Sequence, residues 1–309
     1  MTKNKHQKNQ GRAYFFAVLS VLFWSTAASA FKITLDYIGF IQIVFVASVT
    51  STIVLFAILF FQGKVGKLSA SSRRDLANSA FLGFLNPFLY YVVLLKAYSI
   101  LPAQVAQPLN FTWPIMLVLL SIPLLRQKIS VYSLFAMLIS FTGVFFISSE
   151  GNPFDMNFSD TLGVSLALGS SVIWALFWIY NVRDERNEII KLFLNFLFAS
   201  LFAAVLMLFT SGFERFHLYG FYGGVYIGAF EMGFTFVFWL KALQFSESTD
   251  RVSNLIYLTP FFALLLINLL LGEKIYTTTV IGLLFIIGGI FIQKKISESK
   301  TGIPARGNG

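Results

Sequence analysis

Apolar residues fall in long blocks along this chain, and short polar segments separate the blocks. Each block has about 20 residues, which is the length that a helix needs to cross the hydrocarbon core of a bilayer. Because the connections are short, neighbouring helices are expected to run antiparallel. The pattern predicts ten transmembrane helices, at residues 13–34, 38–61, 77–98, 103–124, 130–149, 162–182, 189–211, 221–243, 252–271 and 277–293.

The composition agrees with a membrane protein. Hydrophobic residues make up 57% of the 309 positions and charged residues only 12%, far from the usual make-up of a soluble domain. The chain has no cysteine and only two histidines, His6 and His217, so neither a metal site nor a histidine-based catalytic triad is expected. No phosphate-binding loop sequence occurs, which argues against ATP-driven transport by this chain alone. We predict an all-α membrane protein that is not an enzyme, with no cofactor and no metal.

The charge pattern orients the predicted helices. A net charge of +9 on a soluble protein would suggest nucleic-acid binding. Here the Lys and Arg residues are dispersed between apolar blocks, as in cytoplasmic loops, so no nucleic-acid partner is expected. With the N-terminus in the cytoplasm, 19 of the 23 Lys and Arg residues fall inside and 4 outside. This imbalance predicts that both termini are cytoplasmic.

The chain also repeats itself at a spacing of 145–146 residues. The matched positions are Leu95–Ala97 with Leu240–Ala242, Asn86 with Glu231, Pro114 with Pro260, and Gly143 with Gly289. Each half then holds five helices. Because five is odd, the second half enters the membrane from the opposite side, which is the inverted-topology repeat of many secondary transporters.

This repeat defines the predicted organisation of the chain. The expected parts are a basic cytoplasmic tail at 1–12, a first five-helix repeat at 13–149, an extracytoplasmic loop at 150–161, a second repeat at 162–293 and a cytoplasmic tail at 294–309.

Several residues carry a resemblance to a known family. A Trp stands in the first helix of each half, Lys-Ala ends the third helix, Pro lies in the fourth, and Leu-Gly-Glu-Lys follows the ninth at 271–274. Over about residues 12–295 these features resemble the EamA-like branch of the drug/metabolite transporter superfamily. The first half departs from the pattern, with Arg-Gln-Lys at 126–128. The resemblance implies a bacterial inner-membrane exporter of amino acids, other metabolites or drugs, and leaves room for a homodimer.

Glu231 is the strongest candidate for a functional residue. It lies near the middle of a predicted helix, where a carboxylate costs roughly 2.5–3.5 kcal/mol on insertion scales. Such a residue normally faces a cavity or the interior of the bundle. On an α-helix Gly228 and Thr235 share its face, and in the first repeat the matching face carries Asn86 and Tyr90. We expect Glu231 and Asn86 to meet at a central cavity; the alternative is that Glu231 only pairs with a neighbouring helix.

Aromatic and amide side chains extend this candidate site. Trp24 and Trp174 sit about ten residues inside their helices, too deep for the aromatic belt at the membrane surface. Pro108 and Pro114 predict either a broken fourth helix, of the kind that lines transport cavities, or a kinked helix that curves around the bundle. The predicted substrate-binding residues are Trp24, Asn86, Tyr90, Gln107, Asn110, Trp113, Trp174, Trp178, Glu231, Thr235 and Tyr257.

These observations predict a secondary transporter of the cell inner (plasma) membrane. It would export small metabolites (amino acids, aromatic or cationic compounds) by alternating access, with Glu231 as the hypothetical site of proton coupling. Its expected partners are a small-molecule substrate and the lipid bilayer. A non-transporting scaffold and a membrane enzyme are the alternatives, although the loops show no cluster of catalytic residues.

Overall fold

The computed structural model describes residues 8–126, 131–152, 160–210, 217–246, 252 and 254–301, and these residues form helices and connecting segments without a strand. The elements are α1 (Gln10–Leu35), α2 (Phe40–Phe61), η1 (Val65–Ala70), α3 (Arg73–Gly83), η2 (Phe84–Leu89), α4 (Tyr90–Ile100), α5 (Ala103–Asn110), α6 (Trp113–Leu125), α7 (Val131–Ser148), α8 (Thr161–Val182), α9 (Glu188–Phe209), α10 (Leu218–Tyr226), η3 (Ile227–Phe234), α11 (Thr235–Phe245), η4 (Asn254–Leu258), α13 (Thr259–Leu271) and α14 (Thr277–Thr301). The all-helical prediction is confirmed for this part of the chain.

Eight helical stretches in the described ranges are long and apolar enough to cross a membrane. They are Gln10–Leu35, Phe40–Phe61, Arg73–Ile100, Ala103–Leu124, Thr161–Asn181, Glu188–Phe209, Leu218–Phe245 and Asn254–Leu271. Two shorter apolar helices, Phe135–Ser148 and Thr277–Ile292, coincide with the fifth and tenth predicted segments. The predicted ends at residues 130 and 211 lie outside the described residues.

Local sequence explains where several helices begin and end. The side chain of Asn9 accepts the backbone N–H of Arg12 at 3.0 Å and caps α1. Ser72 and Asp75 form a capping box at the start of α3, which satisfies two backbone donors that the helix leaves free. At the C-terminal end of α13, Gly272 adopts the left-handed conformation (φ 68°) that commonly stops a helix.

Two spans are interrupted by π-helical turns at matching places. The segment η2 separates α3 from α4, and η3 separates α10 from α11. Asn86 lies within η2 and Glu231 within η3. π-Helical turns are rare, and those that occur often lie at functional sites. Both interruptions therefore mark Asn86 and Glu231, which the sequence repeat pairs, as candidate functional residues.

The fourth predicted helix is broken as expected. It consists of α5 and α6, with residues 111 and 112 between them. Pro114 explains the break, because its ring nitrogen cannot donate to the carbonyl group of Asn110 four residues earlier. The polar side chains of Gln107 and Asn110, at the end of α5, therefore lie beside the break between α5 and α6.

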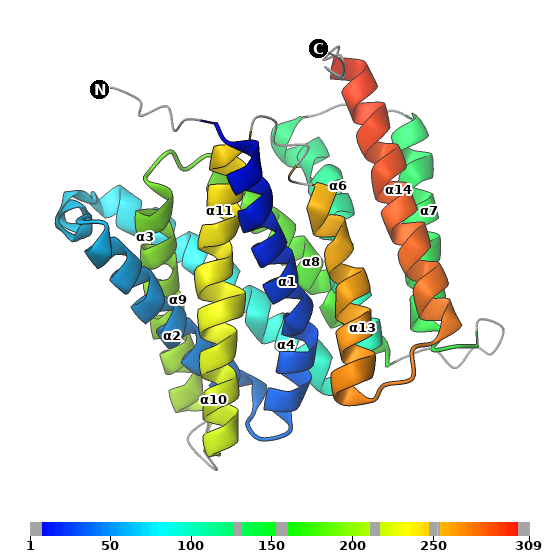
Figure 1. The fold of residues 1–309 in the computed structure, drawn as a ribbon, viewed down its shortest axis with the longest axis horizontal. Helices are drawn as coiled ribbons and strands as arrows, with labels where there is room; N and C mark the ends of the chain where they lie inside the picture. Colours follow the sequence, from blue (N-terminus) through cyan, green and yellow to red (C-terminus); the bar gives the residue numbers. More distant parts are fainter. Residues whose placement is uncertain are drawn as a thin grey trace.

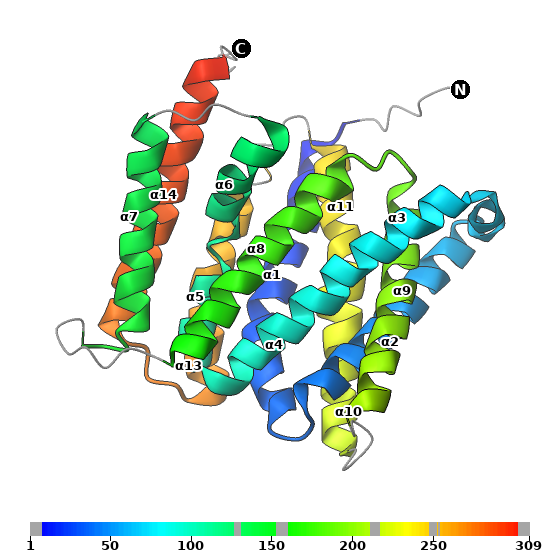
Figure 2. The same ribbon diagram turned by 180° about the vertical axis from the view of Figure 1, so that it is seen from behind.

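The helices pack so that each half of the chain contacts the other. The first helix, α1, packs against α11 and α13, while α8 packs against α4 and α6. α2 lies along α9, and α7 pairs with α14 at one side of the bundle (Figures 1 and 2). The start of α1 and the end of α14 lie at the same end of the bundle (Figure 1).

Glycine permits the closest of these contacts. A Cβ atom at Gly83 would meet the carbonyl oxygen of Asn195 in α9, and one at Gly228 would lie 2.5 Å from the carbonyl oxygen of Ala47 in α2. Because small residues let helix backbones approach, these two positions hold the interrupted spans against the opposite half. The hydroxyl of Ser51 adds a 2.7 Å hydrogen bond to the carbonyl group of Gly228.

Candidate substrate-binding cavity

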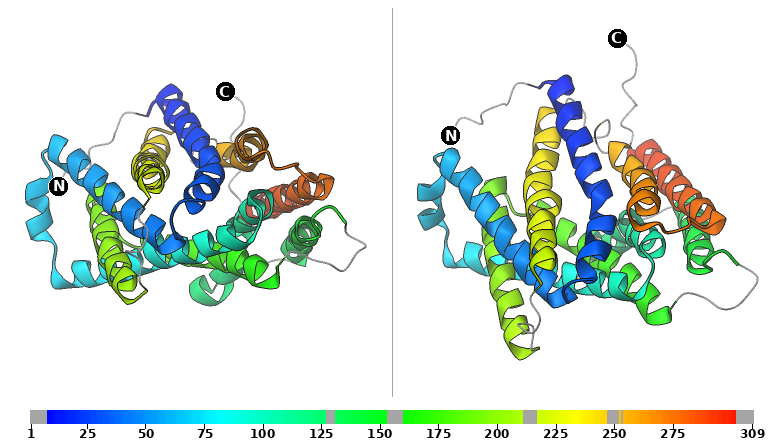
Figure 3. Two further views of the ribbon diagram at one scale, coloured as in Figure 1. Left: turned by 90° about the horizontal axis from the view of Figure 1, so that it is seen from below. Right: turned by 60° about the horizontal axis from the view of Figure 1, so that its bottom comes forward.

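A cavity of about 600 Å³ lies in the middle of the bundle. One wall comes from α1, η3, α11, η4 and α13, and the other from α4, α5, α6 and α8, which Figure 3 shows on opposite sides. Phe31 and Tyr98, each 2% exposed, pack ring against ring at one end, with centroids 5.3 Å apart, and close it. Arg183 lines the other end and is exposed, so the cavity opens beside the end of α8.

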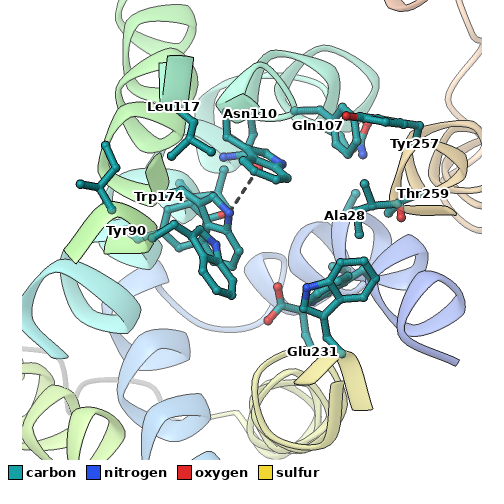
Figure 4. A pocket seen from close by; sticks show the side chains of 18 of the residues that line it. Ala28, Tyr90, Gln107, Asn110, Leu117, Trp174, Glu231, Tyr257 and Thr259 are labelled. Atoms are coloured by element: carbon teal, nitrogen blue, oxygen red, sulfur yellow. Dashed lines mark hydrogen bonds between the residues drawn. The ribbon is translucent and has the colours of Figure 1, made fainter. Parts of the chain in front are cut away.

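The side chain of Glu231 faces this cavity (Figure 4). Its residue exposure is only 7%. The hydroxyl group of the buried Tyr91 donates a hydrogen bond to Oε2 at 2.6 Å, and no Lys or Arg of the described ranges forms an ion pair with this carboxyl group. Among the described residues, Glu231 is thus an acid at the cavity wall that has a hydroxyl partner and no cationic one.

Aromatic rings line the same cavity as the carboxyl group of Glu231. The ring of Trp174 lies 4.7 Å from that of Tyr90 and 5.8 Å from that of Phe236, measured between centroids. Trp24 lies 6.2 Å from the same Phe236 and 5.6 Å from Trp239. Phe236 therefore connects the two tryptophans of the two first helices, and flat faces of this kind bind apolar bodies and cations.

Some polar atoms of the wall are already paired within the protein. Tyr90 donates to Oδ1 of Asn110 at 3.2 Å (Figure 4), and Nδ2 of Asn110 donates to the hydroxyl of Ser170 at 2.8 Å. These two bonds fix the amide of Asn110. They join the interrupted fourth span to α4 and α8.

Other polar atoms of the wall have no protein partner among the described residues. They are Oε1 of Gln107, Nε1 of Trp174 and the hydroxyl of Thr259, all buried. A buried polar atom that lacks a hydrogen bond is costly and calls for an explanation. A polar ligand in the cavity would supply the missing partners.

Nine of the eleven predicted binding residues line this cavity: Trp24, Tyr90, Gln107, Asn110, Trp113, Trp174, Trp178, Glu231 and Tyr257. Asn86 and Thr235 are not on the wall. Asn86 is buried with φ −149° and ψ 121° inside the kinked turn η2, so its side chain leaves the face expected of a regular helix. The hydroxyl of Thr235 donates to the carbonyl group of Phe230. A π-turn holds more residues than an α-turn, so a spacing of four no longer keeps Thr235 on the face of Glu231.

The structure also adds residues that sequence reasoning missed. Tyr91 donates the hydrogen bond to Glu231, whereas the sequence pattern predicts its neighbour Tyr90 as the binding residue. Trp239 and Thr259 line the cavity. Trp239 follows Glu231 by eight residues, a spacing that could have indicated the same helix face. The charge pattern predicts only a cytoplasmic loop position for Arg183, and nothing in the sequence indicates that it lies at the cavity mouth.

An ionic contact lies in the connection between α8 and α9, and its arginine also binds α3. Nε of Arg186 donates to Oδ1 of Asp184 at 2.9 Å, and its NH2 group donates to the hydroxyl of Ser79 at 2.8 Å. Burial alone would raise the pKa of Asp184, but the hydrogen bonds and positive charge of Arg186 outweigh it and hold that pKa below its usual range. The carboxylate is therefore ionised at neutral pH.

Helices long and apolar enough to cross a membrane, around a central cavity with an acid in its wall, are typical of a multi-pass membrane transporter. The sequence pattern of the EamA-like transporter family matches residues 11–149 and again 161–293. The chain belongs to this family.

Relatives and a solved structure agree with this assignment. An "uncharacterized transporter" of Clostridium kluyveri is 24% identical over 94% of this chain and 96% of its own length. Another from Archaeoglobus fulgidus is 26% identical over 91% of this chain and 98% of its own length. A crystal structure covering 94% of this chain and 99% of its own has a TM-score of 0.65 at 17% identity, which shows a shared fold.

Proposed function

We propose that this chain is a secondary transporter that exports small metabolites through the central cavity by alternating access. The observation that carries the proposal is Glu231 at an aromatic cavity that opens at one end and is closed at the other. A carboxylate that has no cationic partner among the described residues, in a cavity lined by several tryptophans, suits an amine or another organic cation. Aromatic compounds and amino acids fit the same walls.

Polar atoms that lack a partner among the described residues support a substrate with a second polar group. Nε1 of Trp174 is a donor, Oε1 of Gln107 is an acceptor, and the hydroxyl of Thr259 can act as either. A substrate that places its cationic group at Glu231 would pair with the carboxylate. Its polar end would supply the missing hydrogen-bond partners of these three atoms. When no substrate is bound, Glu231 is free to hold a proton instead, so exchange of a proton for a cation is the proposed form of coupling.

The proposed membrane arrangement is ten crossings in two inverted halves, with both termini in the cytoplasm and the chain in the inner membrane. The pairing of α7 with α14 supports an internal two-fold relation. A Cβ atom at Gly143 would meet the carbonyl oxygen of Gly282, and one at Gly289 would lie 2.5 Å from that of Ala136. The same 146 residues separate Gly143 from Gly289 and Ala136 from Gly282. The contact that α7 makes with α14 at one pair of positions is therefore repeated by α14 with α7 at the matched pair, as an inverted repeat requires. The homodimer stays a prediction.

Transport by the purified chain in proteoliposomes tests the proposal. We expect saturable uptake of at least one organic cation or aromatic compound under an imposed pH gradient, with no uptake into protein-free vesicles. If a broad panel of amino acids, aromatic compounds and amines is neither bound nor moved, the proposed function is wrong.

A further inference from the structure

The closed end of the cavity is held by an acidic side chain from the second half of the chain. The helix α5 begins after Pro102, which offers no side-chain acceptor to the first backbone donors. Instead the backbone N–H groups of Ala103 and Gln104 donate to the two carboxylate oxygens of Glu273, at 2.9 and 3.1 Å. A carboxylate at a helix N-terminus is favourable, because it meets free donors and the positive end of the helix dipole.

Gln104 strengthens the same connection. Its Nε2 donates to the carbonyl group of Lys274 at 2.9 Å, and its Oε1 accepts the backbone N–H of Tyr276 at 2.9 Å. The carbonyl group of Glu273 accepts a hydrogen bond from Nδ2 of Asn268 at 3.0 Å. Gln104 is only 3% exposed. The start of α5 and the segment 273–276 therefore form one hydrogen-bonded unit that joins the two halves.

A basic side chain holds the other side of the same turn. Nζ of Lys32, near the end of α1, donates to the carbonyl groups of Tyr98 and Leu101 at 2.9 and 3.1 Å. These carbonyl groups belong to the last turn of α4 and the residue after it, where a cation is favourable. The turn at residues 100–103 is therefore held by a cation where α4 ends and by an anion where α5 begins.

We propose that Glu273 and Lys32 keep this end of the cavity closed, and that release of their contacts with the turn at 100–103 opens the cavity to the other side. The inference rests on the proposed alternating access. Tyr98, whose carbonyl group Lys32 holds, is itself part of the closed end. Glu273 and Lys32 are positioning residues that act through α4 and α5, and α5 in turn carries Gln107 and Asn110 on the cavity wall.

Distance measurements between spin labels test this proposal. The chain has no native cysteine, so Cys introduced at the exposed positions Ser99 and Thr277 can be labelled selectively on the two sides of the closure. In proteoliposomes we expect Glu273→Gln to raise the ratio of long-distance to short-distance conformers about tenfold, the effect of losing one charge-assisted hydrogen bond. Lys32→Met should shift the ratio in the same direction, and Glu273→Asp should have an intermediate effect.

Glu185→Gln is the matched control, because Glu185 is exposed in the connection between α8 and α9, near the opposite end. It should leave the distance ratio unchanged. Unchanged distances in folded Glu273→Gln and Lys32→Met variants would overturn the closure proposal, whatever their transport rates. Absence of transport in the unmodified chain would instead contradict the proposed function, while the distance ratios would still report whether Glu273 and Lys32 hold this end. Thermal unfolding of each variant establishes that it is folded.

Discussion

Two neighbouring glycines in α14 should respond in opposite ways to the same substitution. A Cβ atom at Gly289 would lie 2.5 Å from the carbonyl oxygen of Ala136 and 3.0 Å from the backbone nitrogen of Ser140, whereas a Cβ atom at Gly288 would meet nothing within 4 Å. In a helix interior, Gly→Ala is worth about 0.8–1.0 kcal/mol of stability. Gly288→Ala should therefore stabilise the protein by roughly that amount.

Gly289→Ala has the same gain in helix propensity, but its new methyl group also forces α7 and α14 apart. Overpacking of this kind typically costs about 1–3 kcal/mol, and the backbone atoms of Ala136 and Ser140 cannot rotate away as a flexible side chain could. The helix-propensity gain cancels between the two variants, so their difference of about 1–3 kcal/mol measures the contact itself.

Thermal unfolding in detergent is the assay for this pair. One kcal/mol shifts the Tm by roughly 2–4 °C for chains of 150–250 residues, and by less for a longer chain. We expect Gly289→Ala to unfold several degrees below Gly288→Ala. Equal Tm values for the two variants would refute the close packing of α7 on α14, and with it the internal two-fold relation drawn from this contact.

Two further predictions concern the cavity and its rim. Trp174→Phe keeps a ring against Tyr90 but removes Nε1, so the KM for transport should rise about 2–10-fold, the value of one neutral hydrogen bond; an unchanged KM would show that Nε1 does not contact the substrate. The pKa of Asp184 is lowered in the folded protein, so its contact with Arg186 should stabilise the fold at every pH above the unfolded pKa near 3.9. This stabilisation should be lost as the pH falls through the lower pKa of the folded protein. Asp184→Asn should therefore flatten the acid side of a Tm-against-pH curve, and an identical curve would contradict the assigned role of Arg186.

The helices could be predicted because the relevant signal is local. Blocks of about 20 apolar residues have few structures available in a bilayer other than a helix, and an acid in such a block is costly unless it faces a cavity. That argument predicted a cavity wall for Glu231, with pairing to a neighbouring helix as the alternative, and the structure places Glu231 on the wall. Trp24 and Trp174 followed from their depth, since the membrane surface could not account for them.

The details that failed depend on contacts between distant parts of the chain. A π-turn cannot be recognised from a run of apolar residues, so the regular helix face assumed for Glu231 included Thr235, and Asn86 was placed in the cavity by symmetry alone. The hydroxyl partner of Glu231 comes from Tyr91, 140 residues earlier. In the sequence, Glu273 stands out only through the family resemblance, because its contact with the start of α5 joins residues about 170 positions apart.

Exchange driven by a pH gradient in proteoliposomes that contain Glu231→Gln, compared with Glu185→Gln, tests the central claim most directly. The change replaces a carboxyl group by an amide of nearly the same shape, so the Tyr91 contact and the aromatic walls can remain while the proton-binding group is lost. We predict that Glu231→Gln abolishes transport driven by the pH gradient, while Glu185→Gln transports as the unmodified chain does. Transport by Glu231→Gln with an unchanged rate and an unchanged dependence on the gradient would contradict the account.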